Sequence, residues 1–377
     1  MRYIHIVQVH LMSGGGVGSV INDLCESMSK HTNEVYVVSL FRRENVDFEQ
    51  SEEWAKKRGI KVLFMQKTAK ESWVKVFRRL RETLKNLSKD EQCCLYMHLK
   101  WGVLAGIIGS LGMRNIRRVE VYHSGYHNYK LQAAACKRFI SKHIAVSKES
   151  KQQLVDWFHI SPNKVEVVYN GVDIEYIRAN SCTEKSTDSI LKILSVGRLT
   201  RQKGLLYAIK AFSELTDEGL LNDCTYTIVG RGELMEEAKE LSKGYVTFTG
   251  QIPREDVYKM ISSSDIVFFP SVWEGNSIFL LEVLALGKPL IVSDIVSSRE
   301  VLNFEPLKDG ELCRLEYFGV VVRAEDTDSC KNALLEIVGN RQLLDSMASR
   351  VKMLADDFSI NKQVSGYLKV AEDVFNA

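Results

Sequence analysis

Short β-branched runs alternate with longer amphipathic stretches along most of this 377-residue chain. Such alternation is typical of parallel sheets whose strands are joined by crossover helices. The predicted strands of a first series are residues 4–9, 35–40, 61–65, 94–97, 118–122, 143–146 and 165–168. Those of a second series are residues 192–196, 225–229, 246–248, 266–269, 289–292 and 319–321. The pattern predicts an α/β protein with two doubly wound Rossmann-like domains, and ligands bind such domains at strand carboxyl ends, here facing a central cleft.

A polar stretch without hydrophobic periodicity, residues 180–189, separates the two series and is interpreted as a linker. We therefore expect an N-terminal domain at residues 1–175 and a C-terminal domain at residues 190–355. Residues 356–377 have a helical pattern and are expected to form a terminal segment that could pack back on the N-terminal domain. Residues 101–113 are uncharged but too few to span a bilayer, so a buried helix is expected there.

The net charge of +2 conceals an uneven distribution. Residues 1–170 carry 27 Lys and Arg against 16 Asp and Glu, which leaves 23 against 32 for the rest. A basic front half favours an anionic partner. No DNA-binding motif or aromatic-studded basic strand accompanies it, so nucleic acid is not expected.

The eight cysteines have no paired zinc or redox spacing, and we expect them to be reduced and mostly buried. The first residues show no secretory signal pattern, so a cytoplasmic location is expected.

A basic amphipathic segment spans residues 67–89. It holds eight basic and two acidic residues, and its apolar positions recur every three or four residues. Such a helix could rest on anionic lipid at the inner face of a membrane. The alternative is a solvated cationic face above an apolar stripe that packs into the core.

A glycine-rich segment at residues 14–18 follows the first predicted strand and precedes a helical pattern. Glycines let the backbone approach a ligand, and the free N–H groups of a helix start attract phosphate. A dinucleotide fingerprint would need glycine at position 19, where serine stands. The NAD interpretation is therefore weak, although Arg42 and Arg43 keep an NADP phosphate as an alternative.

The second domain opens with a strand followed by Gly197, Arg198 and, five residues later, Lys203. Cations at the carboxyl end of a strand could neutralise a diphosphate by charge-assisted hydrogen bonds without a metal ion. Glu274 and Glu282 are separated by seven residues after a later strand. If Glu274 precedes a helix that contains Glu282, the two carboxylates lie roughly 12 Å apart along the axis, which favours binding over shared acid–base roles.

Together with Asn170-Gly171-Val172-Asp173, these motifs resemble the retaining glycosyltransferase family 4, also described as glycosyl transferases group 1, which has the GT-B fold. The resemblance implies that Arg198 and Lys203 bind the donor diphosphate. It also implies that Glu282 binds the ribose hydroxyls and that Glu274 binds the transferred sugar.

The resemblance further assigns donor-binding roles to a larger set of positions in the glycine loops and at the predicted helix start. These are Gly15, Gly16, Gly18, Gly197, Gly230, Arg231, Gln251, Ile252, Asn276, Ser277 and Ile278. His123, which follows a predicted strand, matches the family histidine near the reacting sugar. His10 and His127 match nothing and are interpreted as structural.

Asp326 and Asp328 match the Asp-x-Asp metal site of a different architecture, but they precede a helical pattern, where capping and the helix dipole explain them. No metal and no other cofactor is therefore expected.

The resulting expectation is a retaining hexosyltransferase that moves a sugar from a nucleoside diphosphate sugar, with UDP favoured, to a saccharide or lipid-linked hydroxyl acceptor in polysaccharide or glycolipid biosynthesis. Two alternatives are a nucleotide-sugar epimerase, which would need positioned acid–base groups and no acceptor, and a non-catalytic nucleotide-sugar binding protein.

Overall fold

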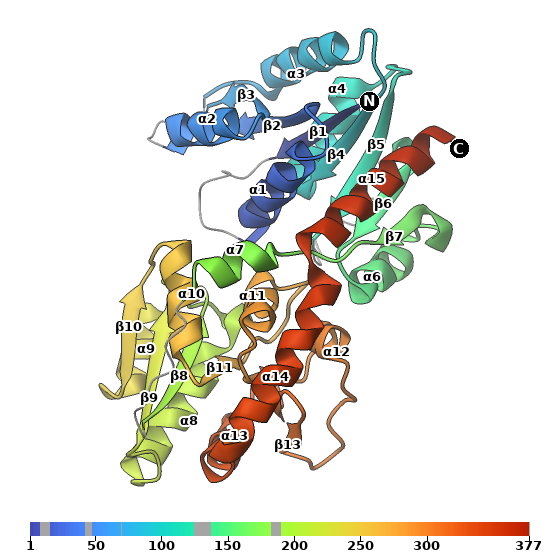
Figure 1. Ribbon diagram of the computed structural model, residues 1–377. Helices are drawn as coiled ribbons and strands as arrows, with labels where there is room; N and C mark the ends of the chain where they lie inside the picture. The colour runs from blue at the N-terminus through green and yellow to red at the C-terminus, as the bar shows by residue number, and fades with distance from the viewer. Residues whose placement is uncertain (8–15, 42–46, 69, 124–136, 182–189, 377) are drawn as a thin grey trace. The chain divides into compact units, whose positions relative to one another are not determined.

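The computed structural model describes residues 1–7, 16–41, 47–68, 70–123, 137–181 and 190–376. The chain divides into two compact units. Unit 1 contains Met1–Gly171 and Ile360–Ala377, and unit 2 contains Val172–Ser359. Each unit is a seven-stranded sheet with helices on both faces, as Figure 1 shows. The predicted fold class, with two doubly wound α/β domains, is confirmed.

Unit 1 has an all-parallel sheet with the strand order β3-β2-β1-β4-β5-β6-β7. Its strands are β1 (Arg2–Val7), β2 (Val35–Phe41), β3 (Lys61–Lys67), β4 (Cys93–His98), β5 (Ile116–Tyr122), β6 (Lys142–Ala145) and β7 (Val165–Val167). Its helices are α1 (Gly16–Ser29), α2 (Asp47–Lys57), α3 (Trp73–Leu87), α4 (Leu99–Ser110), α6 (Lys148–Phe158) and α15 (Ile360–Asn376), with 3-10 turns η2 (Lys137–Phe139) and η3 (Pro162–Lys164).

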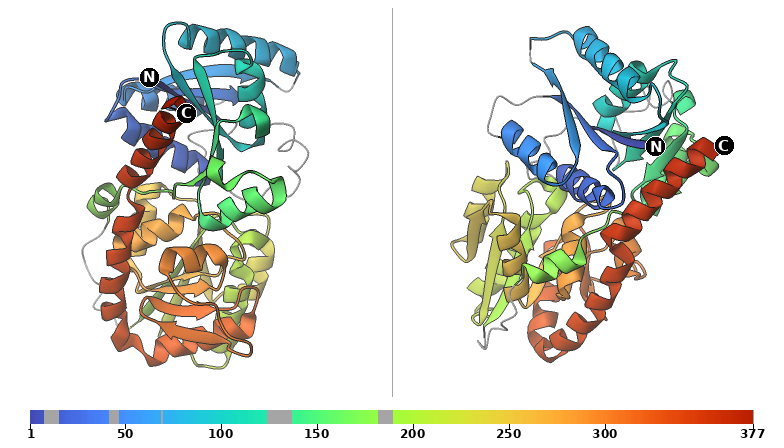
Figure 2. Two further views of the ribbon diagram at one scale, coloured as in Figure 1. Left: turned by 90° about the vertical axis from the view of Figure 1, so that its right-hand side faces the viewer. Right: turned by 45° about the horizontal axis from the view of Figure 1, so that its top comes forward.

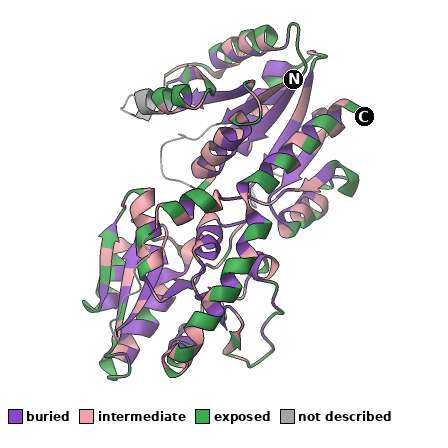
Figure 3. Cartoon of the chain, viewed as in Figure 1, coloured by how far each residue is buried: buried purple, intermediate pink, exposed green. Residues whose placement is uncertain are grey.

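The two faces of the unit 1 sheet are covered by different helices. On one face α1 and α15 pack together over β1, β4 and β5, with Leu24, Tyr96 and Tyr367 among the fully buried side chains. The views in Figure 2 also place α15 beside α1. On the other face α3 and α4 cover Ile6 and Met97. Because both faces are covered, the central strand β4 is buried along its whole length, and the colouring of Figure 3 shows that buried residues dominate the sheet.

Unit 2 has the strand order β10-β9-β8-β11-β12-β14-β13. Its strands are β8 (Leu191–Val196), β9 (Cys224–Val229), β10 (Val246–Gly250), β11 (Ile266–Phe269), β12 (Leu290–Ser293), β13 (Cys313–Glu316) and β14 (Gly319–Val322). Its helices are α7 (Ile174–Ala179), α8 (Leu205–Asp217), α9 (Met235–Ser242), α10 (Arg254–Ser263), α11 (Ile278–Leu286), α12 (Val296–Leu302), α13 (Thr327–Gly339) and α14 (Leu344–Leu354), with 3-10 turns η4 (Arg201–Lys203), η5 (Arg341–Leu343) and η6 (Ala355–Phe358). Apolar side chains of α8, α9 and α13 form one core with the strands.

Sequence periodicity missed the strand β13, which pairs antiparallel with β14 at the edge of the unit 2 sheet. Its side chains are only partly buried, and Arg314 forms ion pairs with Glu311 and Glu316 instead of packing into the core. An edge strand with one covered face needs no continuous apolar run, so the pattern used to find buried strands does not detect it.

In each sheet the order in which successive strands are added reverses between two neighbouring strands. These strands are β1 and β4 in unit 1 and β8 and β11 in unit 2. The crossover helices leave such a pair toward opposite faces, which opens a crevice at the carboxyl ends of the two strands. Ligands of doubly wound sheets bind at this position. The topology therefore singles out the segments that follow these four strands.

The acidic residues at the start of α13 have the predicted capping role. Asp326 is the N-cap residue, and one of its carboxylate oxygens accepts a hydrogen bond from the backbone N–H of Ser329 at 2.9 Å. Asp328 lies in the first turn, where the helix dipole favours negative charge.

The basic segment at residues 67–89 is divided between two elements. Lys67 ends β3 and is buried, and Arg79 pairs with Glu71 at 2.6 Å. The exposed cations are Lys70, Lys75, Arg78, Arg81, Lys85 and Lys89. The uncharged stretch near residues 101–113 forms α4, which is mostly buried, as predicted. Among the described helices, none has the length and hydropathy needed to cross a bilayer.

The contact of α15 with the unit 1 core predicts a large stability effect at Tyr367, which is fully buried. Tyr367→Ala should lower the free energy of unfolding of unit 1 by about 3–5 kcal/mol, because it removes a buried aromatic ring and leaves a cavity. Urea unfolding followed by tryptophan fluorescence measures it, since Trp54, Trp73, Trp101 and Trp157 lie in unit 1. The exposed Lys369→Ala on the same helix is the control. Equal stability of the two variants would contradict this role of α15.

Candidate functional site

The predicted residues of unit 2 gather at the switch point of its sheet. The segment Gly197–Gly204 follows β8, and residues 270–277 follow β11, the neighbouring strand. The two segments are joined by hydrogen bonds from Val272 N–H to the Gln202 carbonyl at 2.8 Å and from the Gln202 side chain to the Trp273 carbonyl at 3.1 Å. The motifs that the sequence singled out separately thus form one surface.

Glu274 is held by a cation from the other segment. Its Oε1 atom lies 2.5 Å from Nζ of Lys203 and accepts a hydrogen bond from the Ser271 hydroxyl at 2.9 Å. Only 8% of the Glu274 side chain is exposed. A carboxylate in that position must be paired, because removing an unpaired charge from water costs several kcal/mol. The pair fixes Glu274 just before α11, which begins at Ile278.

Glu282 lies inside α11 and has a separate set of partners. Arg254, the first residue of α10, places Nη2 2.9 Å and Nε 3.0 Å from Glu282 Oε1, and the Tyr258 hydroxyl donates to the same oxygen at 3.3 Å. Sequence reasoning missed Arg254, Tyr258 and Ser271. Each lies near a recognised motif, but their contacts with the glutamates depend on how separate loops meet.

Two glycines allow the loops of the site to pack closely. Gly204 has φ +61°, and a Cβ atom there would lie 2.0 Å from the carbonyl oxygen of Pro270. At Gly230, with φ +136°, a Cβ atom would lie 1.9 Å from the Gly197 carbonyl oxygen. Both the backbone conformation and the space exclude a side chain. The loops after β8, β9 and β11 are therefore in direct backbone contact.

The remaining predicted residues of unit 2 differ in exposure. Arg198, Arg231 and Gln251 are exposed, and Ile252 is partly buried. Asn276 and Ser277 are buried at 7% and 9% exposure, and Ser277 is the N-cap residue of α11. The first N–H groups of this nine-residue helix have no intrahelical partner and form an anion-attracting end beside Glu274.

The glycine segment of unit 1 is only partly described. Gly16 and Gly18 lie in the first turn of α1 and not in a preceding loop, and the N–H groups of that turn have no intrahelical partner. Gly15, His10, His127, Arg42 and Arg43 lie outside the described residues.

His123 follows β5 directly and is the end of a row of three buried histidines. Its Nε2 atom lies 3.0 Å from Nδ1 of His98, whose Nε2 atom lies 3.1 Å from Nδ1 of His5. Burial lowers the pKa of His5 to about 3 and that of His123 to about 4, and it also lowers the pKa of His98, with a further contribution from its neighbours. All three rings are therefore neutral at physiological pH. Sequence analysis missed His98, although it follows a predicted strand as His123 does.

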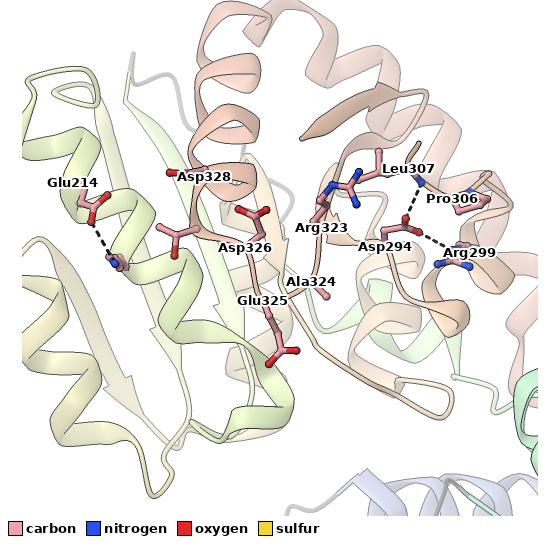
Figure 4. A pocket seen from close by; sticks show the side chains of 12 residues that line it. Glu214, Asp294, Arg299, Pro306, Leu307, Arg323, Ala324, Glu325, Asp326 and Asp328 are labelled. Carbon is pink, nitrogen blue, oxygen red and sulfur yellow. Dashed lines mark hydrogen bonds and ion pairs between the residues drawn. The ribbon is translucent and has the colours of Figure 1, made fainter. Parts of the chain in front are cut away.

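The cavity shown in Figure 4 lies elsewhere in unit 2. It has a volume of about 700 Å³ and is lined by residues of α8 and of the segments after β12 and β14. Its charged side chains are Glu214, Asp294, Glu325, Asp326, Asp328, Lys210, Arg299 and Arg323. None of the predicted site residues lines it, and the excess of carboxylates disfavours an anionic ligand.

No arrangement of three or more His, Cys, Asp or Glu side chains suited to a metal ion occurs within the part of the chain that is described. In the unit 2 site Lys203 and Arg254 are paired with Glu274 and Glu282, and Arg198 is exposed.

Comparisons with known proteins cover both units. Residues 183–353 match the family described as "Glycosyl transferases group 1", and residues 14–176 match "Glycosyltransferase Family 4". The UDP-Gal:alpha-D-GlcNAc-diphosphoundecaprenol alpha-1,3-galactosyltransferase of Escherichia coli is 27% identical over 63% of this chain and 61% of its own length. An N-acetylgalactosamine-N,N'-diacetylbacillosaminyl-diphospho-undecaprenol 4-alpha-N-acetylgalactosaminyltransferase of Campylobacter jejuni is 29% identical over 59% of this chain and 58% of its own length.

The matched region thus spans less than two thirds of these relatives. Among solved structures, Anabaena HepE in complex with UDP and glucose has a TM-score of 0.76 at 16% identity, with all of both chains covered. That likeness shows the fold, so the predicted GT-B fold is confirmed.

The buried histidines predict an acid-sensitive unit 1. In the unfolded chain a histidine binds a proton near pH 6.5, whereas the folded chain excludes it until about pH 4 for His123 and about pH 3 for His5. Stability is therefore fully present above pH 6.5 and falls as the pH drops toward 4. His5→Phe should reduce this loss by about 3 kcal/mol at pH 4. Urea unfolding at pH 7, 5.5 and 4 measures it, with the exposed His31→Gln as control. A His5→Phe curve parallel to the wild type would refute it.

Proposed function

The chain belongs to the group 1 and family 4 glycosyltransferases, and we propose that it transfers a sugar from a nucleoside diphosphate sugar to a hydroxyl acceptor. The observation that carries the proposal is the surface at the carboxyl ends of β8 and β11. There a cationic segment contacts a glutamate at the start of an apolar helix.

The diphosphate is proposed to bind at Arg198, Lys203 and the first N–H groups of α11. Arg198 is exposed, and its guanidinium forms no hydrogen bond or ion pair within the described parts of the chain. A guanidinium can donate two parallel hydrogen bonds to a phosphate. Lys203 is already oriented by Glu274, so its ammonium group needs little ordering when a phosphate arrives.

The two glutamates are proposed to bind hydroxyl groups at opposite ends of the donor. A carboxylate oxygen that already accepts from a cation still has lone pairs for a hydroxyl donor. In Glu274 the atom that accepts from Lys203 is Oε1, and Oε2 of the same carboxylate would hold the transferred sugar, while Glu282 would hold the ribose. Gly230, Arg231, Gln251 and Ile252 would flank the base, and Gly197 would contact the donor beside Arg198.

UDP is the proposed nucleotide, and a lipid-linked saccharide is the proposed acceptor. The E. coli relative is named for UDP-Gal and a diphosphoundecaprenol acceptor, and the C. jejuni relative for a diphospho-undecaprenol acceptor. HepE was solved with UDP and glucose. These names support polysaccharide or glycolipid assembly as the process in which this chain works.

In unit 1, His123 is proposed to contact the reacting sugar, and Gly15, Gly16 and Gly18 to contact phosphate. His123 is 8% exposed at the carboxyl end of β5, where ligands of such sheets bind.

The proposed chemical step is driven by stabilisation of the leaving group. As the bond between the anomeric carbon and the phosphate oxygen breaks, negative charge grows on the diphosphate, and fixed cations and amide dipoles stabilise it. The departing phosphate accepts the proton of the acceptor hydroxyl, and the new bond forms on the same face, with retention. The positive charge comes from Arg198 and Lys203, so no divalent cation is required.

Removal of the Arg198 charge should lower kcat with a UDP-sugar by at least 10²-fold, on the order of 3 kcal/mol, because one donor to the developing charge is lost. The assay measures transfer from radiolabelled UDP-galactose and UDP-N-acetylglucosamine to an undecaprenyl diphosphate saccharide, for Arg198→Gln and for Arg201→Gln. Arg201 is an exposed cation three residues away and is the matched control.

Arg201→Gln should stay within about threefold of the wild type, which is a small fraction of the effect expected for a lost donor. The reactions contain EDTA, since the same proposal predicts turnover without a metal ion. Equal activity of the two variants would overturn the role of Arg198, and complete loss in EDTA that magnesium restores would overturn the metal-free mechanism.

Peripheral contact with anionic lipid is proposed for the exposed face of α3. Lys75, Arg78 and Lys85 are exposed there together with Val74, whose exposed fraction is 65%. Each cation near an anionic surface contributes about 1 kcal/mol. A lipid-linked acceptor would be reached from that surface.

The triple variant Lys75→Gln, Arg78→Gln, Lys85→Gln should bind vesicles containing phosphatidylglycerol roughly 10²-fold more weakly than the wild type, because three charge contacts are lost. Vesicle flotation in low salt measures it. The double variant Lys56→Gln, Lys57→Gln removes exposed lysines of α2 and is the control. Equal flotation of wild type and triple variant would exclude this surface.

A further inference from the structure

The row of histidines in unit 1 follows directly from the register of the sheet. His5 on β1 pairs with Tyr96 on β4, and His98, two residues later, points to the same face. His98 in turn pairs with Val121 on β5, and His123 follows two residues later on that face. Each step moves one strand across and two residues toward the carboxyl edge. The row therefore runs from the core, where His5 and His98 are fully buried, to His123 at the edge.

The nitrogen-to-nitrogen contacts impose an order on the protons. A neutral imidazole has one N–H donor and one acceptor nitrogen, so in a row of three each ring donates in the same direction. In one order His5 donates to His98 and His98 donates to His123. In the other order His123 donates to His98 and His98 donates to His5. Nδ1 of His123 carries a hydrogen only in the first order.

The inner end of the row decides between the two orders. Nε2 of His5 is buried and has no hydrogen-bond partner within the described parts of the chain. In the second order this nitrogen would be an N–H group without an acceptor. In the first order it is a bare lone pair. Unpaired buried N–H groups are the rarer case in folded proteins, so the first order is favoured.

We propose that His5 and His98 are positioning residues that fix His123 as the Nδ1–H tautomer, so that His123 donates a hydrogen bond to the substrate and does not act as a base. This inference rests on the proposed function. A donor suits an oxygen atom of the sugar or of the acceptor. It leaves the acceptor proton to the departing phosphate.

The backbone beside His98 supports a fixed ring position. Leu99, the residue after His98, has φ +60°, a left-handed conformation that is uncommon for leucine. It lets β4 pass directly into α4, so His98 is both the last residue of the strand and the N-cap position of the helix. Such conformations persist only where the surroundings enforce them. On the other side, the His5 ring stacks on Tyr96 at a centroid distance of 4.8 Å.

The tautomer can be read without any substitution. In protein labelled with ¹⁵N-histidine, the chemical shifts and ring couplings distinguish Nδ1–H from Nε2–H at pH 7.5. We expect His123 in the Nδ1–H form, with its signals assigned from a His123→Gln sample. An Nε2–H form for His123 in the wild type would overturn the proposal. The spectrum can be recorded whether or not the chain transfers a sugar. A failed transfer assay therefore counts against the proposed function and not against the proposal that His5 and His98 fix the tautomer of His123.

Two substitutions at His98 separate positioning from packing. His98→Phe keeps a ring of similar size but cannot donate, and we expect kcat for transfer to fall at least tenfold with KM for the donor within twofold. His98→Asn places an amide N–H near the position of Nδ1, and we expect it to restore kcat to within threefold of the wild type and to restore the Nδ1–H signal. Equal kcat in His98→Phe and the wild type would overturn the proposal.

Tyr96→Phe is the matched control for burial. It removes a buried hydrogen bond, from the Tyr96 hydroxyl to the Tyr367 carbonyl at 2.6 Å, and keeps the ring that stacks on His5. We expect the His123 tautomer and kcat to stay as in the wild type. If Tyr96→Phe changed the His123 tautomer and kcat as much as His98→Phe does, packing alone would determine the state of the His123 ring. That result would overturn the proposed role of His5 and His98.

Discussion

The segments that follow parallel strands all begin at the same edge of the sheet, and that constraint determines where the candidate residues lie in both units of this protein. In unit 2 the segments after β8 and β11 meet there, which brings Lys203 to Glu274. In unit 1 the same geometry places His98 and His123 at the ends of neighbouring strands. Helix starts lie at this edge too, so unpaired N–H groups and side chains converge on one region. Loop sequence can then change while the location of the site stays fixed by topology.

The free-energy cost of burying polar side chains at these edges is offset in two different ways. Each buried glutamate of the unit 2 site is paired with a cation, Glu274 with Lys203 and Glu282 with Arg254. The three histidines of the row, His5, His98 and His123, have no counter-ion among the described residues and remain neutral, each hydrogen-bonded to the next ring. A paired carboxylate can receive hydroxyl groups, whereas a neutral imidazole with a fixed tautomer offers one donor in one direction. The first arrangement suits binding of a polyhydroxyl ligand, and the second suits orientation of a single atom.

The last helix shows how distant sequence completes a core. Strands β1 and β4 lie in the N-terminal part of the sequence, yet one face of their sheet is covered by α15, which begins at Ile360. Tyr367 packs near Tyr96 and His5, with ring centroids 5.1 and 6.4 Å away. The hydrophobic covering of the histidine row, and therefore the low pKa of its members, depends on residues far away in sequence. Truncation of the terminal helix would expose the row to water.

The sequence by itself determined the alternation of strands and helices and the two-domain α/β fold, and it singled out Arg198, Lys203, Glu274 and Glu282 as candidates, because hydrophobic period and local motifs depend on consecutive residues. It also fixed the capping role of Asp326. Only the tertiary structure decided that Arg254 and Tyr258 hold Glu282, that β13 closes the edge of a sheet, and that His5, His98 and His123 form one row. These contacts join residues from separate elements, and strand register, which places them, is set by packing across the sheet and not by any local pattern.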